Sequence, residues 1–151
     1  MKTAIIYESY HHGNTKKLLD AIVKKHEVTL FDARQVLAAE LSDYDLIGIA
    51  SGIAFGKYYK NVAALAAKSL PEKKDVFLIF TSGNGSKEYG TDMEKLCEKK
   101  QCRVVGKYGC SGFDTVGPFK LIGGVSKGHP TSDEIAGAAA FYESLIKQER
   151  E

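Results

Sequence analysis

The chain of 151 residues contains no tryptophan, only three prolines and only three cysteines. Cys97, Cys102 and Cys110 are odd in number and lack C-x-x-C spacing, which argues against a disulfide framework and against a cysteine zinc site. We therefore expect small, buried thiols in a reducing compartment. No apolar run is long enough to span a membrane, and no secretory leader is recognisable, so we expect a cytoplasmic protein with no membrane association.

Charge of one sign is not in excess either. The 21 basic and 19 acidic residues leave a net charge of +2, so nothing in the composition calls for a nucleic acid or an anionic membrane as partner. Hydrophobic residues make up 44% of the chain and charged residues 26%, which is typical of a globular protein. The length suits one domain with a real core, and we expect residues 1–151 to form a single domain.

Short apolar runs alternate with amphipathic segments along the chain. Strands are expected at 3–7, 28–31, 44–50, 75–81 and 102–110, and helices at 15–26, 57–70, 91–100 and 132–148. A helical turn is possible within 32–40, and Thr131 or Ser132 is the natural cap of the last helix, with Glu134 in its first turn. This alternation predicts a three-layer α/β/α sandwich around a parallel sheet.

Ligands of such sheets bind beyond the carboxyl ends of the strands, which selects the loops at 9–15, 51–60, 82–90 and 111–119. The first loop reads Ser9-Tyr10-His11-His12-Gly13-Asn14-Thr15 and carries no acidic residue. It leads into a helix whose first N–H groups lack partners and whose dipole end is positive, an arrangement that suits a phosphate. The same residue types cap helices, so a capped turn without a ligand explains this stretch equally well.

The second and third loops combine glycines with aromatic rings. Residues 51–56 read Ser-Gly-Ile-Ala-Phe-Gly, and two tyrosines follow; the glycines allow close approach to a flat ligand and the rings offer a stacking face. Residues 82–85 read Ser-Gly-Asn-Gly, with Tyr89 shortly after, and suit the polar edge of a heterocycle. Simple packing of the rings against the next helix, and an ordinary polar turn, remain alternative explanations of these loops.

Two other phosphate sites do not fit. The stretch from Gly52 to Lys57 is one residue short of a P-loop, and Tyr58 stands where a serine or threonine would bind magnesium. A receiver domain needs an acidic pair after the first strand and an aspartate after the third, where this chain has residues 8–9 (Glu-Ser) and 51–52 (Ser-Gly).

The histidines do not indicate catalysis. His11, His12 and His129 have no nucleophile at a strand–helix elbow to act upon. The adjacent pair also lacks a third metal ligand, so no metal site is predicted, and hydrogen bonding is the commoner use of a loop imidazole.

Together the three loops resemble the FMN site of short-chain flavodoxins. Residues 9–15 are similar to the family's Ser/Thr-x-Thr-Gly-Asn-Thr phosphate loop with one residue added, and residues 51–57 and 81–85 stand where its two ring-binding loops lie. The similarity extends over essentially the whole chain. It implies a flavodoxin-like five-stranded parallel sheet of strand order 2-1-3-4-5, non-covalent FMN, and electron transfer to redox partner proteins by a monomer or weak dimer.

The resemblance also implies which residues bind the cofactor, and it implies no catalytic residue. Ser9, one or both histidines, Asn14 and Thr15 would hold the phosphate, and Phe55 and Tyr89 would flank the isoalloxazine ring. The complete set consists of Ser9, His11, His12, Gly13, Asn14, Thr15, Ser51, Gly52, Ile53, Ala54, Phe55, Gly56, Ser82, Gly83, Asn84, Gly85 and Tyr89.

The chain departs from the family pattern in two ways. Phe55-Gly56-Lys57 replaces the Trp-Gly-Asp often found in the first ring loop, and the chain is slightly basic where flavodoxins are usually acidic. An ammonium group near the ring would favour the anionic reduced flavin and make the couple less reducing. Gly56 is the natural hinge for a peptide flip beside the flavin.

Two other functions remain open. An FMN-dependent NAD(P)H or quinone oxidoreductase on the same fold would need a second pocket over the ring, which Phe113, Asp114, Phe119 and Lys120 of the long 111–130 loop could supply. A domain that has lost FMN and only binds partners is the other possibility, against which the intact Gly-Asn-Thr at 13–15 argues.

Overall fold

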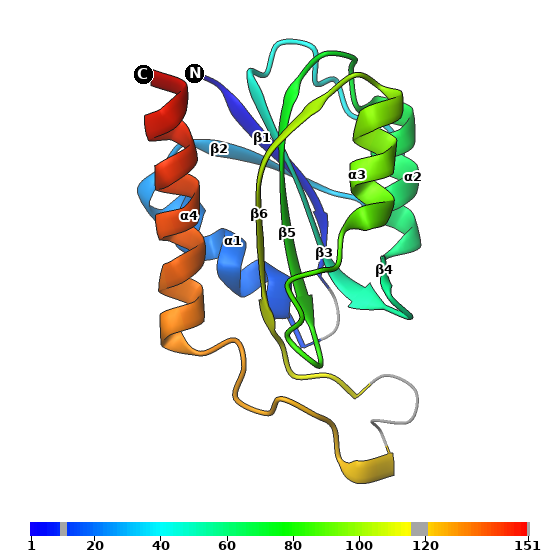
Figure 1. Cartoon of the computed structure of the whole chain (residues 1–151), viewed down its shortest axis with the longest axis vertical. Helices are drawn as coiled ribbons and strands as arrows, with labels where there is room; N and C mark the ends of the chain where they lie inside the picture. Colours follow the sequence, from blue (N-terminus) through cyan, green and yellow to red (C-terminus); the bar gives the residue numbers. More distant parts are fainter. Residues whose placement is uncertain (10–11, 116–120, 151) are drawn as a thin grey trace.

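The computed structural model describes residues 1–9, 12–115 and 121–150, the last without its side chain. Strands and helices alternate along the chain (Figure 1). The elements are β1 (Thr3–Glu8), α1 (Asn14–Lys25), β2 (Val28–Asp32), β3 (Leu46–Ala54), β4 (Lys57–Tyr58), α2 (Lys60–Ser69), β5 (Asp75–Ser82), α3 (Thr91–Lys99), β6 (Arg103–Ser111) and α4 (Ser132–Arg150).

The sheet has the order β2-β1-β3-β5-β6, and all four pairings along this path are parallel. The expected fourth and fifth strands are β5 and β6, so the predicted order 2-1-3-4-5 is confirmed. The short β4 was not expected. It pairs antiparallel with the end of β3, off the main path of the sheet.

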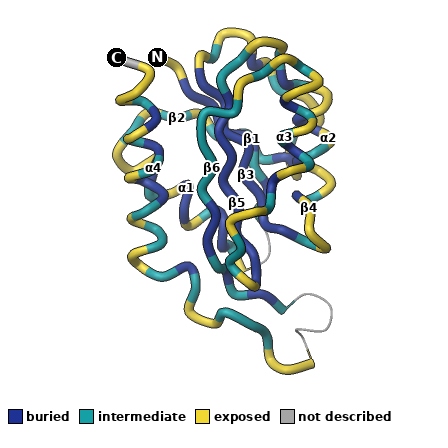
Figure 2. Tube along the Cα trace, in the orientation of Figure 1, coloured by how far each residue is buried: buried dark blue, intermediate teal, exposed yellow. Residues whose placement is uncertain are grey.

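Two helical layers cover the sheet, α1 with α4 on one face and α2 with α3 on the other (Figure 1). Leu18, Ile22 and Tyr142 belong to the apolar cluster on the first face, whereas Val62 and Met93 belong to the cluster on the second. The central strands are buried along most of their length, and exposed positions lie on the outer sides of the helices (Figure 2). This is the predicted three-layer sandwich.

The structure corrects the chain between β3 and α2. The expected strand at 44–50 starts at Leu46 and runs on to Ala54, and the helix expected from Lys57 starts only at Lys60. Lys57 and Tyr58 instead turn back along β3, because the buried hydroxyl of Tyr58 donates to the carbonyls of Ile49 and Ile79, each at 3.0 Å. A helix starting at Lys57 would break this anchor.

The possible helical turn at 32–40 is a single turn at the start of this stretch and does not extend into a helix. The backbone N–H groups of Gln35 and Val36 donate to the carbonyl of Asp32, and the Asp32 carboxylate accepts the N–H of Arg34 at 2.9 Å. These bonds form an isolated turn closed by an aspartate side chain, which is a common alternative to helix formation for this residue type.

Both ends of the described chain lie at the same edge of the sheet, opposite the loops that follow β1, β3, β5 and β6 (Figure 1). The hydroxyl of Tyr142 in α4 meets that of Thr3 at 2.8 Å, which ties the last helix to the start of β1. The α4 helix starts with a capping box, as expected. Thr131 Oγ1 accepts the N–H of Glu134 at 3.2 Å, and Glu134 Oε1 accepts the N–H of Thr131 at 2.8 Å.

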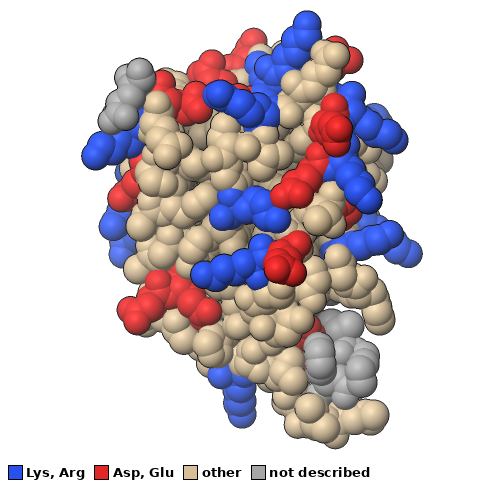
Figure 3. Space-filling view, in the orientation of Figure 1, with Lys and Arg blue, Asp and Glu red and all other residues tan. Residues whose placement is uncertain are grey.

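Charged side chains of both signs are interspersed on the face seen in Figure 3, in keeping with the small net charge. Fewer charges are seen at the lower end of this view, where the strands end. Within the described part of the chain, no helix combines the length and apolarity that crossing a bilayer requires.

Candidate functional site at the carboxyl edge of the sheet

The turn after β1 forms a cap for α1. Ser9 Oγ accepts the backbone N–H of Lys16 at 2.9 Å, which satisfies one of the unpaired donors at the start of the helix. His12 and Gly13 both adopt left-handed φ angles, 57° and 65°. A side chain at Gly13 would meet nothing within 4 Å, so this point of the turn is open. His11, one of the expected phosphate ligands, lies outside the described residues.

Asn14 and Thr15 point into the protein from the first turn of α1, and both are buried. Asn14 Nδ2 donates to the carbonyl of Phe113 at 2.8 Å, and the hydroxyls of Thr15 and Thr81 lie 3.0 Å apart. Asn14 Oδ1 is buried and has no hydrogen-bond partner among the described residues. These bonds join the start of α1 to the end of β5 and to the loop after β6.

A tight hairpin connects β3 to β4 and presents Phe55 at its tip. Ala54 pairs with Lys57, so the connection consists of Phe55 and Gly56 alone, with φ angles of 53° and 80°. Two consecutive left-handed residues are the signature of a type I′ turn, whose usual residues are Asn-Gly. A phenylalanine in this conformation is uncommon, and its side chain is 88% exposed.

Ser51 and Gly52 lie within β3, not in a loop as expected. Ser51 Oγ accepts the N–H of Tyr59 at 2.9 Å and donates to the carbonyl of Gly52 at 2.6 Å. The tyrosine ring rests on Gly52, where a Cβ would collide with its hydroxyl. Gly52 therefore allows the close approach of a protein ring. Ile53 is buried, and Ala54 is half-buried at the start of the hairpin.

The turn after β5 is held by its own polar side chains. Ser82 Oγ accepts the N–H of Gly85 at 3.1 Å, and Asn84 Oδ1 accepts the N–H of Ser86 at 3.0 Å. Asn84 Nδ2 donates to the hydroxyl of Tyr89, also at 3.0 Å. The third loop is thus a preformed polar turn that positions one aromatic ring.

The loop after β6 packs over the turn that follows β5. Asp114 and Val125 pair through two backbone hydrogen bonds, of 2.9 and 2.8 Å, and a side chain at Gly83 would collide with both residues. Phe113 also contacts His12, with ring centroids 4.3 Å apart. Phe119 and Lys120, proposed above as parts of a second pocket, lie outside the described residues.

His129 and Glu134 form a hydrogen bond of 2.6 Å behind this loop, so His129 is engaged in the capping structure of α4. Burial alone would raise the pKa of the Glu134 carboxyl, but hydrogen bonds from the Thr131 amide and from His129 outweigh it and hold that pKa below its usual value.

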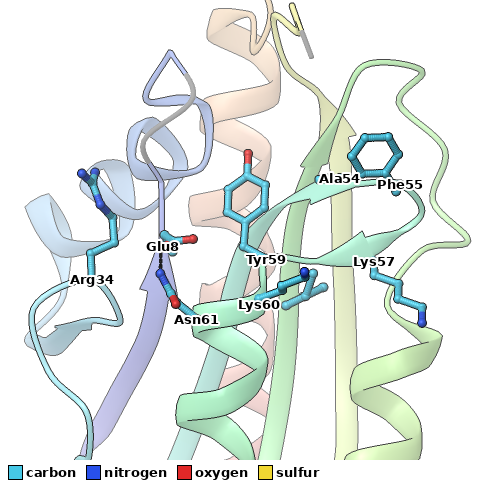
Figure 4. A pocket seen from close by; sticks show the side chains of 9 residues that line it. Glu8, Arg34, Ala54, Phe55, Lys57, Tyr59, Lys60 and Asn61 are labelled. Carbon is cyan, nitrogen blue, oxygen red and sulfur yellow. Dashed lines mark hydrogen bonds between the residues drawn. The ribbon is translucent and has the colours of Figure 1, made fainter. Parts of the chain in front are cut away.

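A cavity with a volume of about 700 Å³ lies on the outer flank of the hairpin (Figure 4). Its nine lining residues are Glu8, Arg34, Ala54, Phe55, Lys57, Tyr58, Tyr59, Lys60 and Asn61. A second hollow, bounded by Asn14, Tyr59, Gly83 and Asp114 among others, holds only about 10 Å³. Tyr59 lines both hollows.

Four residues of this cavity were missed in the sequence: Glu8, Arg34, Lys60 and Asn61. Glu8 is 3% exposed, and its carboxylate accepts the side-chain amide of Asn61 at 2.7 Å. The position of Glu8 at the end of β1 was the one signal in the sequence that could have identified it. Figure 4 also shows Lys57 directed away from the Phe55 ring, so its ammonium group does not lie over the hairpin tip.

The residues at this edge fit a flavin mononucleotide by their chemistry. The orphaned Asn14 Oδ1 needs a donor, and a polyhydroxylated chain carries donors. The open, left-handed turn at Gly13 precedes a helix start, which suits a phosphate. Exposed Phe55 offers a ring face.

Metal and thiol chemistry find no support among the described residues. No three His, Cys, Asp or Glu side chains of the described ranges gather closely enough to hold a metal ion. All three cysteines are free thiols, and Cys97 and Cys110 are buried, as expected. Burial is the main cause that raises the pKa of each of these two thiols to about 12, so they stay protonated and unreactive.

One family model and one relative match most of the chain. The family model described as a flavodoxin domain matches residues 4–112. An uncharacterised protein of Methanocaldococcus jannaschii is 33% identical over 149 residues, which cover 97% of this chain and 99% of that protein.

Solved structures show the same fold. Oxidised flavodoxin 2 from Bacillus cereus is 17% identical with a TM-score of 0.67, covering 98% of this chain and 99% of that one. The rubredoxin oxygen:oxidoreductase of Desulfovibrio gigas is 13% identical with a TM-score of 0.69, and this chain matches 35% of its length. The fold therefore occurs both alone and as part of a longer chain.

Proposed function

The chain belongs to the flavodoxin family, and from this membership we propose that it binds FMN without a covalent bond and carries electrons between redox partner proteins. The observation that carries the proposal is the meeting of three loops at one edge of the sheet. The Thr15–Thr81 contact joins the turn selected as a phosphate site to the segment selected independently as the second ring-binding loop, and the Asn14–Phe113 contact joins the same turn to the loop after β6.

Each loop has a defined part in the proposed site. The turn of residues 9–15 binds the phosphate through backbone N–H groups, with Ser9 and His12 beside it. Asn14 Oδ1 accepts a hydroxyl of the ribityl chain, which removes an unsatisfied buried acceptor. Phe55 and Tyr89 flank the ring, and residues 52–56 and 82–85 face its polar edge.

Bound flavin would supply the one- and two-electron chemistry, and the protein would orient it and tune its potential. The left-handed Gly56 carries no side chain between the hairpin and a ligand, so its peptide can present either N–H or carbonyl to the ring edge. In the proposed site, the loop after β6 would exclude water from the flavin, because its residues pack on Gly83.

The first test is the absorption spectrum of the purified protein and the identity of any flavin released on denaturation. We expect a flavin spectrum and release of FMN. Apoprotein should take up FMN with quenching of flavin fluorescence, and Asn14→Leu should weaken this binding at least tenfold because the donor of the ligand is left unpaired. Apoprotein that binds neither FMN nor FAD at micromolar concentrations contradicts the proposal.

An electron carrier also differs from an oxidoreductase in a simple assay. The FMN-loaded protein should be reduced by dithionite but not oxidise NADH or NADPH with turnover in the presence of a quinone. Steady consumption of either nucleotide, proportional to protein concentration, would assign the chain to the enzymatic alternative.

A further inference from the structure

The cavity on the outer flank of the hairpin, which we call the hairpin trough, is defined by the nine lining residues given above. It shares Ala54 and Phe55 with the proposed flavin site but extends away from it, past Tyr59 to Arg34 in the loop after β2 (Figure 4). Nothing in the proposed binding of FMN uses Arg34, Lys60 or Asn61. The trough is therefore a surface feature that the proposed function leaves unexplained.

The charge of the hairpin trough is positive. Arg34, Lys57 and Lys60 contribute three cationic groups, and Glu8 is the single carboxylate among the nine lining residues. Glu8 is 3% exposed and engaged by Asn61, so it offers little negative charge to solvent. Since the whole chain carries only +2, this concentration of positive charge is local.

The apolar part of the trough is rigid. Tyr58 is buried and holds β4 down through its two bonds to the carbonyls of Ile49 and Ile79. Asp92 accepts the backbone N–H of Tyr58 at 3.2 Å and fixes the hairpin from the side of α3. Phe55 is thus an exposed ring on a braced support. Rigid aromatic anchors and arginines are the side chains that contribute most at protein interfaces.

We propose that the hairpin trough is the docking surface for an acidic redox partner protein. The proposal rests on the proposed function, because it names the class of partner that exchanges electrons with the flavin at this hairpin. Charge complementarity selects an acidic partner. Arg34 and Lys57 lie at opposite ends of the trough (Figure 4), which favours a protein over a small anion, because a protein surface can contact both ends at once.

The test uses an acidic plant-type [2Fe–2S] ferredoxin as a defined probe, titrated into isotope-labelled, FMN-saturated protein and followed by amide NMR. We expect shifts confined to residue 34, residues 54–61 and their neighbours. The dissociation constant should rise at least fivefold between 20 and 200 mM salt, because counter-ions screen exposed charges. Shifts elsewhere, or no shift at all, overturn the proposal.

Charge-reversal variants make the test specific. Lys57→Glu with Lys60→Glu should weaken binding of the ferredoxin at least tenfold. A matched pair, Lys24→Glu with Lys147→Glu, changes the net charge equally at exposed positions of α1 and α4 and should alter binding less than twofold. Equal weakening by both pairs means a general charge effect and overturns the assignment to the trough.

Two further measurements distinguish a small anion as the ligand of the trough and the case in which the protein does not bind FMN. ADP at millimolar concentration should not displace the ferredoxin; displacement together with shifts at residues 54–61 would make the trough a small-anion site and overturn the proposal. FMN retention is measured first by absorption. If FMN does not bind, the same ferredoxin titration is carried out on the apoprotein. It then tests whether the trough is a docking surface independently of FMN binding, because the trough residues lie outside the phosphate turn.

Discussion

Phe55 combines two unusual properties: a bulky residue has a left-handed backbone conformation, and its aromatic ring is exposed. A bulky side chain at φ 53° lies in the left-handed region, at a cost of about 1–3 kcal/mol, and burial does not repay this cost because the ring is 88% exposed. The sequence singled out this ring as a stacking face, but its left-handed turn was not foreseen, because the type I′ turn depends on pairing between β3 and β4.

Phe55→Asn should therefore stabilise the apoprotein and weaken FMN binding. Asparagine is favoured at the first position of a type I′ turn, so we expect about 1 kcal/mol of added stability and an increase in Tm of about 2–4 °C. Loss of the ring should raise the Kd for FMN several-fold. Thermal denaturation and fluorescence titration measure the two effects, and a lower apoprotein Tm would show that the ring stabilises the free hairpin.

The hydroxyl pair of Thr15 and Thr81 is a second residue-scale feature with a clear cost. Thr81→Val leaves the buried Thr15 hydroxyl without its partner, and we expect a loss of about 1–3 kcal/mol in the free energy of unfolding. Thr29→Val is the control, since Thr29 is exposed on β2, and it should change stability by less than about 0.5 kcal/mol. Urea denaturation of both variants compares them; equal effects would mean that the pair contributes nothing.

At the scale of elements, the sequence predicted the helices and strands whose positions depend on local periodicity and capping. It missed element boundaries that depend on contacts with distant parts of the chain. The continuous apolar run in β5 and the cap of α4 are local signals, and both were found where expected. The start of α2 was placed three residues early. Tyr58 fits a helical pattern by itself, and only the carbonyls of Ile49 and Ile79, which come from two other strands, hold it in β4.

The capping box of α4 predicts a pH-dependent contribution to stability. The pKa of Glu134 is lower in the folded protein than its usual value, so its contribution is fully present above the unfolded pKa and is lost as pH falls through the folded pKa. Glu134→Gln should cost about 1 kcal/mol at pH 7, in the range of a lost cap. Denaturation from pH 7 to 3 measures the difference, which should shrink below about pH 4; a constant difference would contradict the ionised form as the source.

At the scale of the whole molecule, the three layers followed from the alternation of strands and helices and the sheet order from the family resemblance, whereas the hairpin trough followed from neither. Arg34, Glu8 and Lys60 are separated along the chain and meet only because β1 and β3 are neighbours and the loop after β2 returns past them. The predicted cofactor-binding residues that the structure describes lie at one edge of the sheet. Their partners, such as Phe113 for Asn14, lie about one hundred residues away and leave no local signal.

Ligand linkage gives a prediction for the whole molecule. FMN at one hundred times its Kd should add about 2.7 kcal/mol to the free energy of unfolding, because it binds only the folded state. For a chain of this size the expected rise in Tm is about 5–11 °C. Calorimetry at increasing FMN concentration measures the shift, with riboflavin, which lacks the phosphate, as the control. Equal shifts with both ligands would mean that the turn at residues 9–15 contributes nothing.

The two chain ends at the edge opposite these loops have a practical consequence. Because Met1 and the end of α4 lie at the far side of the sheet, a peptide tether at either end would leave Phe55 and the neighbouring loops facing outward (Figure 1). The molecule is therefore suited to oriented attachment on an electrode, with its tip presented to the solution. Serial fusion to another domain would likewise leave that tip uncovered.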